Sequence, residues 1–167
     1  MIRRIRRIRR DALPEQIRAG LVRGERVLAT ALDSAGAVVV ATDRALWLPA
    51  AAGWRRLGWE LVDWAGWDAD EALLTVVQSG SATRHHVRVQ PAALVDVVRE
   101  RVNAVIVLSR HVVLSGRRGV RVVGRRSPGG QQIHWSAVLD PGLDIANPEV
   151  RRRVDAEVAV ARAEIGD

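Results

Sequence analysis

The feature that most constrains the fold of this chain is a series of short apolar segments separated by turn residues. Seven such segments lie between residues 26 and 89, and each is four to seven residues long. Segments of this length, joined by turns rich in Asp, Ser, Gly and Pro, are typical of antiparallel strands in a small sandwich or barrel. We therefore expect seven strands, at 26–32, 37–42, 45–48, 55–58, 61–67, 73–77 and 86–89.

Helical patterns flank this series of strands. The segment 14–22 begins with a proline and predicts a short helix. The segment 91–104 predicts a second helix, because Leu94, Val98 and Val102 repeat at helical spacing and form one apolar stripe. A single helix after seven strands predicts a cap on a curled sheet, where the helix hides otherwise exposed edges.

The chain then starts a second, shorter pattern. Three further strands are expected at 105–114, 119–126 and 132–139. A final helix is expected after Asn147, which is a favourable N-cap residue, with Pro148 in the first turn. We predict three parts: a flexible basic tail at 1–10, a strand-rich unit with its capping helix at 11–104, and a βββα extension at 105–167 that packs on this unit.

The composition excludes some classes of protein. The chain has no Phe, Tyr, Cys or Lys, so all 26 basic residues are Arg, a bias that a GC-rich genome explains more simply than nucleic-acid binding. The absence of Cys excludes disulfides and thiol chemistry and fits a reducing cytoplasm. No apolar run approaches the ~18 residues of a membrane span, and the N-terminus lacks the apolar core of a secretory signal. We expect a cytoplasmic location, with peripheral association with the membrane as an alternative.

The net charge of +7 is concentrated in two blocks of sequence. Residues 1–10 hold six arginines, and residues 101–139 hold seven arginines and no acid. The segments 11–100 and 140–167 each carry a charge of −3. Two blocks of one sign indicate places where an acidic partner can bind.

Two stretches resemble bacterial proteins of the pleckstrin-homology-like (PH-like) fold: VVVATDRALWL at 38–48 and RRLGWELVDWAGWD at 55–68. This resemblance implies an α+β, mostly β fold in which seven antiparallel strands form a split, partly open barrel closed by a C-terminal helix. It also implies a binding module rather than an enzyme. Phosphoinositide binding is not implied, because the DSAG turn at 33–36 holds no basic cluster.

Over nearly its whole length the chain also resembles short actinobacterial proteins. The matching residues are GERVLA at 24–29, Trp135, and DPGLD at 140–144. This second resemblance carries no established activity with it.

Five tryptophans stand in the strand-rich segment, and they have two interpretations. Large aromatic side chains stack on bases or ligands, and they also fill a core that has no Phe or Tyr. We expect core packing for most of them. Trp64 and Trp67 are three residues apart, so they lie on opposite faces of a strand. For binding, Trp54 and Trp67 are better candidates than Trp47.

The sequence contains no recognisable catalytic or metal-binding pattern. It has no G-x-S-x-G motif, no P-loop and no G-x-G-x-x-G motif. The adjacent His85 and His86 point to opposite sides of a strand, which separates them as metal ligands. We therefore expect no enzyme, no cofactor and no metal site.

The arginine-rich segment 119–126 is the strongest candidate for a binding surface. As a strand it would carry Arg121 and Arg125 on one face and valines on the other. The alternative is a solvated face that pairs with Asp155 and Glu157 of the acidic final helix. The predicted partner-binding residues of this unit are Arg117, Arg118, Arg121, Arg125, Arg126 and His134.

The tail MIRRIRRIRR is the second candidate. On a helix, Ile2, Ile5 and Ile8 would share an arc of about 120° with arginines around the remainder. Such a basic amphipathic segment can lie on an anionic membrane or on an acidic partner. The alternative is a flexible tail, or a start site placed too far upstream. The predicted contact residues are Arg3, Arg4, Arg6 and Arg7.

From these patterns we expect a non-catalytic adaptor or scaffold that binds an acidic protein surface. The first alternative is nucleic-acid binding, in which the arginine-rich strand face contacts the phosphate backbone. The second alternative is peripheral association with an anionic membrane through the basic tail.

Overall fold

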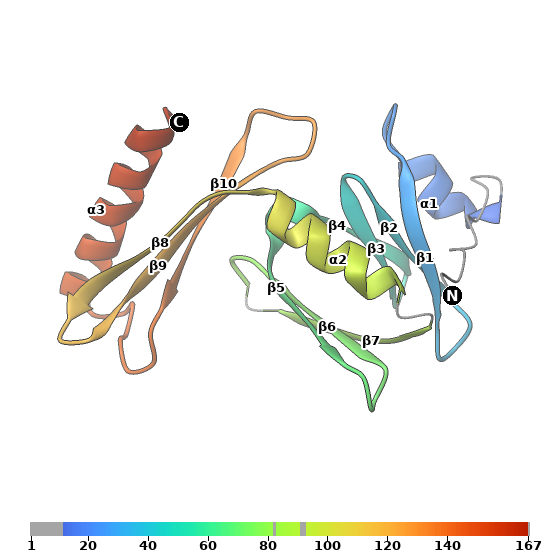
Figure 1. Ribbon diagram of the computed structural model, residues 1–167, viewed down its shortest axis with the longest axis horizontal. Coiled ribbons are helices and arrows are strands. Elements are labelled where there is room, and N and C mark those ends of the chain that lie inside the picture. Colours follow the sequence, from blue (N-terminus) through green and yellow to red (C-terminus); the bar gives the residue numbers. More distant parts are fainter. Residues whose placement is uncertain (1–11, 82, 91–92, 167) are drawn as a thin grey trace. The chain divides into compact units, whose positions relative to one another are not determined.

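The computed structural model describes residues 12–81, 83–90 and 93–166. The chain divides into two compact units, one that ends at Ala104 and one that begins at Val105 (Figure 1). Within the described residues the fold is mixed α+β and mostly β, with one seven-stranded sheet, one three-stranded sheet and three α-helices. The predicted tail at 1–10 and its four contact arginines lie outside the described residues.

The seven strands predicted for the first unit are confirmed. All neighbouring pairs are antiparallel, and their order in the sheet is β4-β3-β2-β1-β7-β6-β5. The strands are β1 (Val27–Asp33), β2 (Val38–Thr42), β3 (Ala45–Ala50), β4 (Gly53–Gly58), β5 (Val62–Asp68), β6 (Leu73–Gln78) and β7 (Arg84–Gln90).

The seven-stranded sheet is open, and this corrects the expected barrel. β4 and β5 stand at the two ends of the strand order, and no closed barrel forms in the part of the chain that is described. The turn η2 (Trp59–Leu61) links these two strands as a 3-10 helix, where a hairpin would need a tight turn. Trp59 is fully buried there, and its Nε1 donates a hydrogen bond of 3.0 Å to the carbonyl of Thr42.

Helix α1 (Glu15–Gly20) packs on the sheet through a small apolar cluster. Ile17 is fully buried, and Gly20 lets the helix approach Trp47, because a Cβ at Gly20 would overlap the indole ring. The short helix predicted at 14–22 is therefore present. The buried residues of the cluster are Leu13, Ile17, Leu21, Val40 and Trp47.

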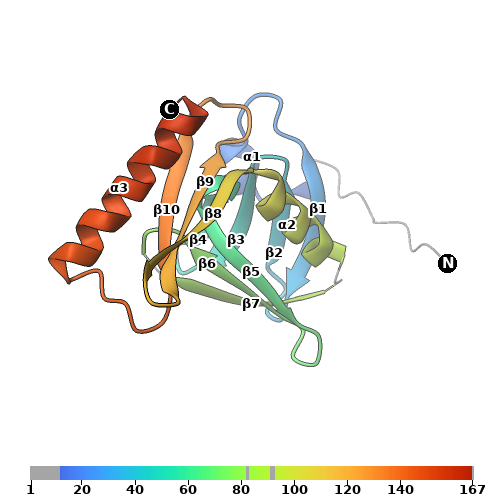
Figure 2. The ribbon, with the colours of Figure 1, turned by 60° about the vertical axis from the view of Figure 1, so that its left-hand side comes forward.

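Helix α2 (Ala93–Ala104) contacts β1, β2, β5 and β7 (Figure 2). Its buried side chains are Leu94, Val95, Val98 and Val102. The predicted apolar stripe of this helix is therefore confirmed.

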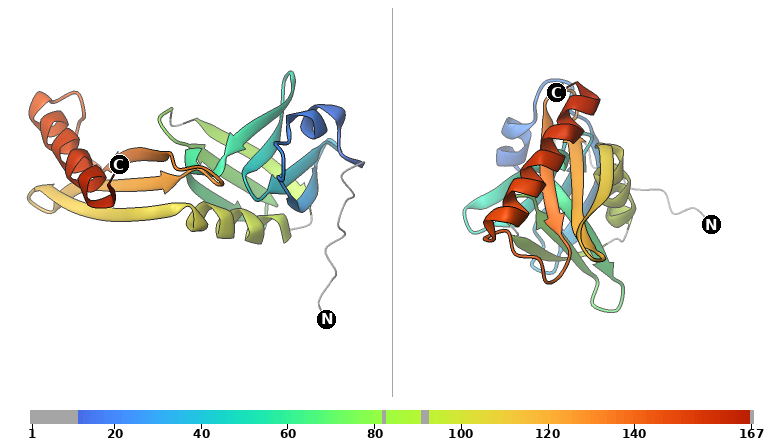
Figure 3. Two further views of the ribbon diagram at one scale, coloured as in Figure 1. Left: turned by 90° about the horizontal axis from the view of Figure 1, so that it is seen from above. Right: turned by 90° about the vertical axis from the view of Figure 1, so that its left-hand side faces the viewer.

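The second unit has the predicted order of three strands and a helix. Its strands β8 (Ile106–Ser115), β9 (Arg118–Arg126) and β10 (Ile133–Leu139) form an antiparallel sheet with β9 in the centre. Helix α3 (Pro148–Ile165) lies against one face of this sheet (Figure 3). The core between them contains Leu114, Val120, Val122, Val154 and Ala161. No helix in the described ranges has both the length and the apolar character of a membrane span.

Candidate functional site

The three-stranded sheet of the second unit has two faces with different side chains. One face is apolar and packs on α3. The opposite face, which we call the outer sheet face, carries three cross-strand rows of side chains. The rows are His111, Arg121 and Val138; Ser109, Val123 and Ser136; and Arg125 with His134.

Arg125 is the main correction to the predicted binding surface. It lies on the same face as Arg121, as predicted, but only 3% of its surface is exposed. Arg121 stands on the same central strand and is exposed, whereas Nη1 of Arg125 donates a hydrogen bond of 2.8 Å to Oγ of Ser136. The prediction that Arg121 and Arg125 share a face was correct, but the prediction that Arg125 is exposed to a partner was wrong.

The remaining predicted residues lie in two separate places. Arg117 and Arg118 stand at the hairpin between β8 and β9, and Arg121 is exposed on the outer sheet face. Arg126 is exposed at the other end of β9, and His134 is half-buried opposite Arg125. Because a strand rises about 3.3 Å per residue, roughly 16 Å of strand separates Arg121 from Arg126. The predicted residues therefore do not form one continuous patch.

The acidic final helix does form ion pairs, but with a different arginine. Arg110 of β8 lies 2.6 Å from the carboxylate of Glu164 and 4.0 Å from that of Glu157. Arg110 pairs in register with Val122, so it stands on the sheet face that α3 covers. Glu157 thus forms its ion pair on the sheet face opposite Arg121. The predicted alternative, in which the arginines of segment 119–126 pair with the final helix, is therefore wrong for Glu157, whose partner is Arg110.

A polar cluster marks the hairpin end of the outer sheet face. Oδ2 of Asp140 accepts a hydrogen bond of 2.7 Å from the amide of Gly119 and lies 2.9 Å from Nε2 of His111. The hydrogen bond from His111, the one from Gly119 and the nearby charge of Arg121 hold the pKa of Asp140 below its ordinary value. The carboxylate ties the end of β10 to the β8–β9 hairpin.

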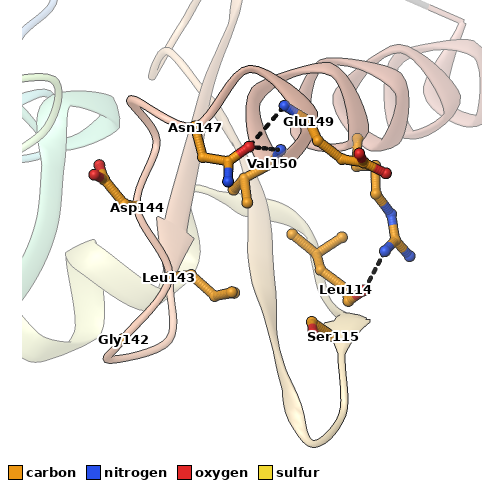
Figure 4. A pocket seen from close by; sticks show the side chains of 9 residues that line it. Leu114, Ser115, Gly142, Leu143, Asp144, Asn147, Glu149 and Val150 are labelled. Atoms are coloured by element: carbon orange, nitrogen blue, oxygen red, sulfur yellow. Dashed lines mark hydrogen bonds between the residues drawn. The ribbon is translucent and has the colours of Figure 1, made fainter.

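A cleft of about 450 Å³ opens beside this hairpin, at the first turn of α3 (Figure 4). The side chains of Leu114, Leu143 and Val150 point into it and form an aliphatic floor. Asn147 begins the helix, because its Oδ1 accepts hydrogen bonds from the amides of Glu149 and Val150. The other lining residues are Ser115, Gly142, Asp144, Asn147, Glu149 and Arg153.

Two arginines, Arg153 and Arg118, lie at this cleft. Arg153 lines it and donates a hydrogen bond to the carbonyl of Leu114. Arg118 donates from Nη1 to the carbonyl of Gly142 at 3.4 Å, and Arg117 is exposed in the same hairpin. Sequence reasoning missed the cleft. The DPGLD stretch and the N-cap Asn147 were both visible as separate signals, but only the fold brings them against Leu114.

The tryptophans of the first unit are distributed unevenly between core and surface. Trp47 and Trp59 are buried, and Trp54 packs against the α1 cluster while its Nε1 donates 2.7 Å to the carbonyl of Val38. Trp64 and Trp67 lie on opposite faces of β5, as predicted. Trp64 is the exposed one, at 53%. It was not among the tryptophans that the sequence favoured for binding.

The histidines of the first unit are engaged locally. His85 Nε2 lies 3.2 Å from Oε1 of Gln78, and His86 Nδ1 lies 3.0 Å from Oγ1 of Thr75. Across the described ranges, no group of three or more His, Cys, Asp or Glu side chains is placed to hold a metal ion.

Comparison with known proteins gives no relative: no protein-family model, no curated protein and no solved structure matches this chain.

Proposed function

We propose that this chain is a non-catalytic binding protein whose second unit docks an acidic, partly apolar protein segment in the cleft beside α3. The observation that carries this proposal is the combination of an aliphatic floor with Arg118 and Arg153 beside it and with Arg117 exposed in the adjacent hairpin. A cleft of about 450 Å³ can take one or two apolar side chains of a ligand. The arginines supply donors for the carboxylates beside them.

Arg118 and Arg153 each retain N–H donors that can bind a ligand. A guanidinium has five N–H donors, and Arg118 and Arg153 each donate to one backbone carbonyl in the hydrogen bonds described above. These contacts hold the side chains beside the cleft, which lowers the entropy cost of binding. The proposed ligand completes the remaining hydrogen bonds.

Two acids also line the cleft, and their placement determines where the ligand carboxylates go. Oδ1 of Asp144 accepts a hydrogen bond of 2.8 Å from the amide of Ala146, and its carboxylate points away from the aliphatic floor (Figure 4). Glu149 stands in the first turn of α3, where a negative charge complements the helix dipole. We therefore place the ligand carboxylates on the hairpin side of the cleft, near Arg117 and Arg118.

For the first unit we propose a PH-like identity. Seven antiparallel strands followed by a packed helix support it, and so do the stretches at 38–48 and 55–68 that resemble PH-like proteins. A PH-like unit is in keeping with a binding protein that has no catalytic step. The absence of Cys supports the cytoplasm as its location.

Fluorescence anisotropy with short labelled peptides tests the proposed cleft. Peptides that alternate Glu with Leu are expected to bind, whereas peptides that alternate Glu with Ser or Lys with Leu are not. Arg118→Ala should weaken binding about tenfold, the equivalent of one charge-assisted hydrogen bond of about 1.4 kcal/mol. Leu143→Ala should weaken the binding of the Glu-Leu peptide, because it removes part of the aliphatic floor. Arg162→Ala, in the last turn of α3, is the matched control and should have no effect.

The same assay separates the alternatives. Duplex DNA that binds more tightly than any peptide, with a steep salt dependence lost in Arg117→Ala and Arg126→Ala, would replace the proposal with phosphate-backbone binding. Capture by anionic vesicles that is lost when residues 1–10 are deleted would replace it with membrane association.

A further inference from the structure

The outward face of strands β5, β6 and β7 in the first unit carries side chains that the proposed function does not use. The strand register places nine residues on it in three cross-strand rows, which we call the β5–β7 platform. The opposite face of these strands is the core side, where Leu74 and Val76 of β6 are buried. The rows of the platform are Trp64, Val77 and Arg84; Gly66, Thr75 and His86; and Asp68, Leu73 and Arg88.

The indole of Trp64 lies against Gly66 on this platform. A Cβ on Gly66 would overlap the six-membered ring of Trp64, so the ring rests directly against the β5 backbone at that position. This end of the indole is therefore in contact with the strand. The side chain as a whole is still 53% exposed, whereas Trp59 is 0% exposed and Trp47 is 4% exposed. An exposed indole face held against a rigid strand is a stacking surface for a planar ring.

Basic side chains form a line on strand β7, which β6 separates from the strand of Trp64. Arg84, His86 and Arg88 occupy every second position and are all exposed. Alternate residues on a strand are about 6.7 Å apart, a separation similar to that of successive phosphates in an extended single strand. The contact of His86 with Thr75 and the ion pair of Arg88 with Glu71 fix two of these side chains in place.

We propose that the β5–β7 platform binds single-stranded nucleic acid. A base stacks on Trp64, and the phosphodiester backbone runs along Arg84 and His86. The combination of an exposed aromatic ring with a line of basic side chains favours this ligand, because an acidic peptide would use the basic side chains and leave the indole without a planar partner. Duplex nucleic acid keeps its bases inside the stack and cannot use Trp64 at all. This platform lies in the first unit, so it is independent of the cleft beside α3.

The test compares two labelled probes in fluorescence anisotropy on the full chain: oligothymidylate, and an abasic deoxyribose-phosphate oligomer of the same length. Both probes carry the same phosphates, so basic segments elsewhere, including the tail, contribute equally to both. We expect the wild-type chain to prefer oligothymidylate at least about fivefold, the lower range for one stacked base. Trp64→Leu keeps Gly66 covered and should abolish this preference while it leaves binding of the abasic oligomer unchanged.

Arg84→Ala should weaken binding of both probes and reduce their salt dependence by about one phosphate contact. Arg99→Ala, on the exposed side of α2, is the matched control and should change neither probe. Should Trp64→Leu fail to fold, photocrosslinking of a bromouracil-substituted strand to the wild-type chain answers the same question. Crosslinks on β5 or β7 support the proposal. Equal affinity for the two probes, crosslinks confined to other segments, or duplex that binds as well as single strand would overturn it.

Discussion

The hydroxyl of Thr42 donates a hydrogen bond of 2.6 Å to the carboxylate of Glu25, and both residues are buried. The other carboxylate oxygen accepts from the amide of Val22 at 3.0 Å and lies 3.6 Å from Nη2 of Arg56. Oγ1 of Thr42 in turn accepts a hydrogen bond of 2.8 Å from the amide of Ala45. Glu25 thus ties the segment before β1 to the turn between β2 and β3. Two stretches that carry the sequence resemblances, GERVLA and VVVATDRALWL, meet at this hydrogen bond.

Removal of this carboxylate is expected to destabilise the first unit strongly. In Glu25→Ala the amide of Val22 loses its acceptor and Arg56 loses its ion-pair partner, so the free energy of unfolding should fall by about 2–4 kcal/mol. Glu25→Gln keeps one acceptor oxygen and should cost less. Urea unfolding measures both. The control is Glu71→Ala, which breaks the exposed pair with Arg88 and should cost no more than about 1 kcal/mol. Equal losses for Glu25→Ala and Glu71→Ala would contradict this account.

The two buried tryptophans should respond differently to replacement by Phe. Nε1 of Trp59 donates to the carbonyl of Thr42, whereas Nε1 of Trp47 is buried without a hydrogen-bond acceptor in the described part of the chain. Both replacements lose similar apolar volume, but Trp59→Phe also leaves a buried carbonyl without its donor, and Trp47→Phe removes a donor that has no acceptor. We expect Trp59→Phe to cost about 1–2 kcal/mol more than Trp47→Phe. Thermal unfolding of the two variants decides the point.

Periodicity was sufficient to predict the secondary structure, because each element carries its own local signal. The ten strands are short apolar runs with turn residues between them, and α2 and α3 have apolar stripes at helical spacing. Asn147 was recognised as the N-cap of α3 because its side chain satisfies helix amides wherever the helix packs. These features depend on residues that are close together in the chain, so they can be predicted from the sequence.

Exposure and closure could not be predicted, because they depend on residues distant in the chain. Arg125 and Arg121 have the same position in the strand alternation, yet Arg125 is buried with a hydrogen bond to Ser136 and Arg121 is exposed. β4 and β5 stand at the two ends of the strand order, and no local pattern of residues shows whether two such strands pair with each other. The spacing of Trp64 and Trp67 predicts that they lie on opposite faces of the strand, but not which of the two is exposed. In the structure the more exposed one is Trp64. Which face meets the core is decided by α2 and by the bend in the sheet.

The pKa of His85 should report the charge of Arg55 on strand β4. Burial lowers the pKa of His85 from its ordinary 6.5, and the charges of Arg55 and His86 lower it further. Arg55→Gln should therefore raise the pKa of His85 toward 6.5, which an NMR titration of the ring protons measures. Arg99→Gln, on α2, serves as the control. No movement of the His85 titration in Arg55→Gln would show that the charge of Arg55 does not contribute to the pKa.

The lowered pKa of His85 also makes the free energy of unfolding depend on pH. Because the folded state holds the His85 pKa below 6.5, the unfolded state binds the proton more readily, and stability is lost as the pH falls through 6.5 toward the folded pKa. The Arg55→Gln variant should lose less stability over this range than the wild type, because its folded and unfolded pKa values are closer together.

Asp140 should govern part of the acid sensitivity of the second unit. Its pKa is held below 3.8 by the hydrogen bonds from His111 and Gly119, and by the charges of His111 and Arg121. The charged form therefore stabilises the folded state, and this contribution is complete above 3.8 and lost as the pH falls through the lower folded pKa. In Asp140→Asn the side chain no longer titrates, so the variant should be less stable than the wild type at neutral pH and should converge on it at low pH. Asp155→Asn, on the exposed side of α3, should follow the wild-type curve throughout. Urea midpoints across this pH range test the prediction, and a constant offset between Asp140→Asn and the wild type would show that Asp140 acts through its shape rather than its charge.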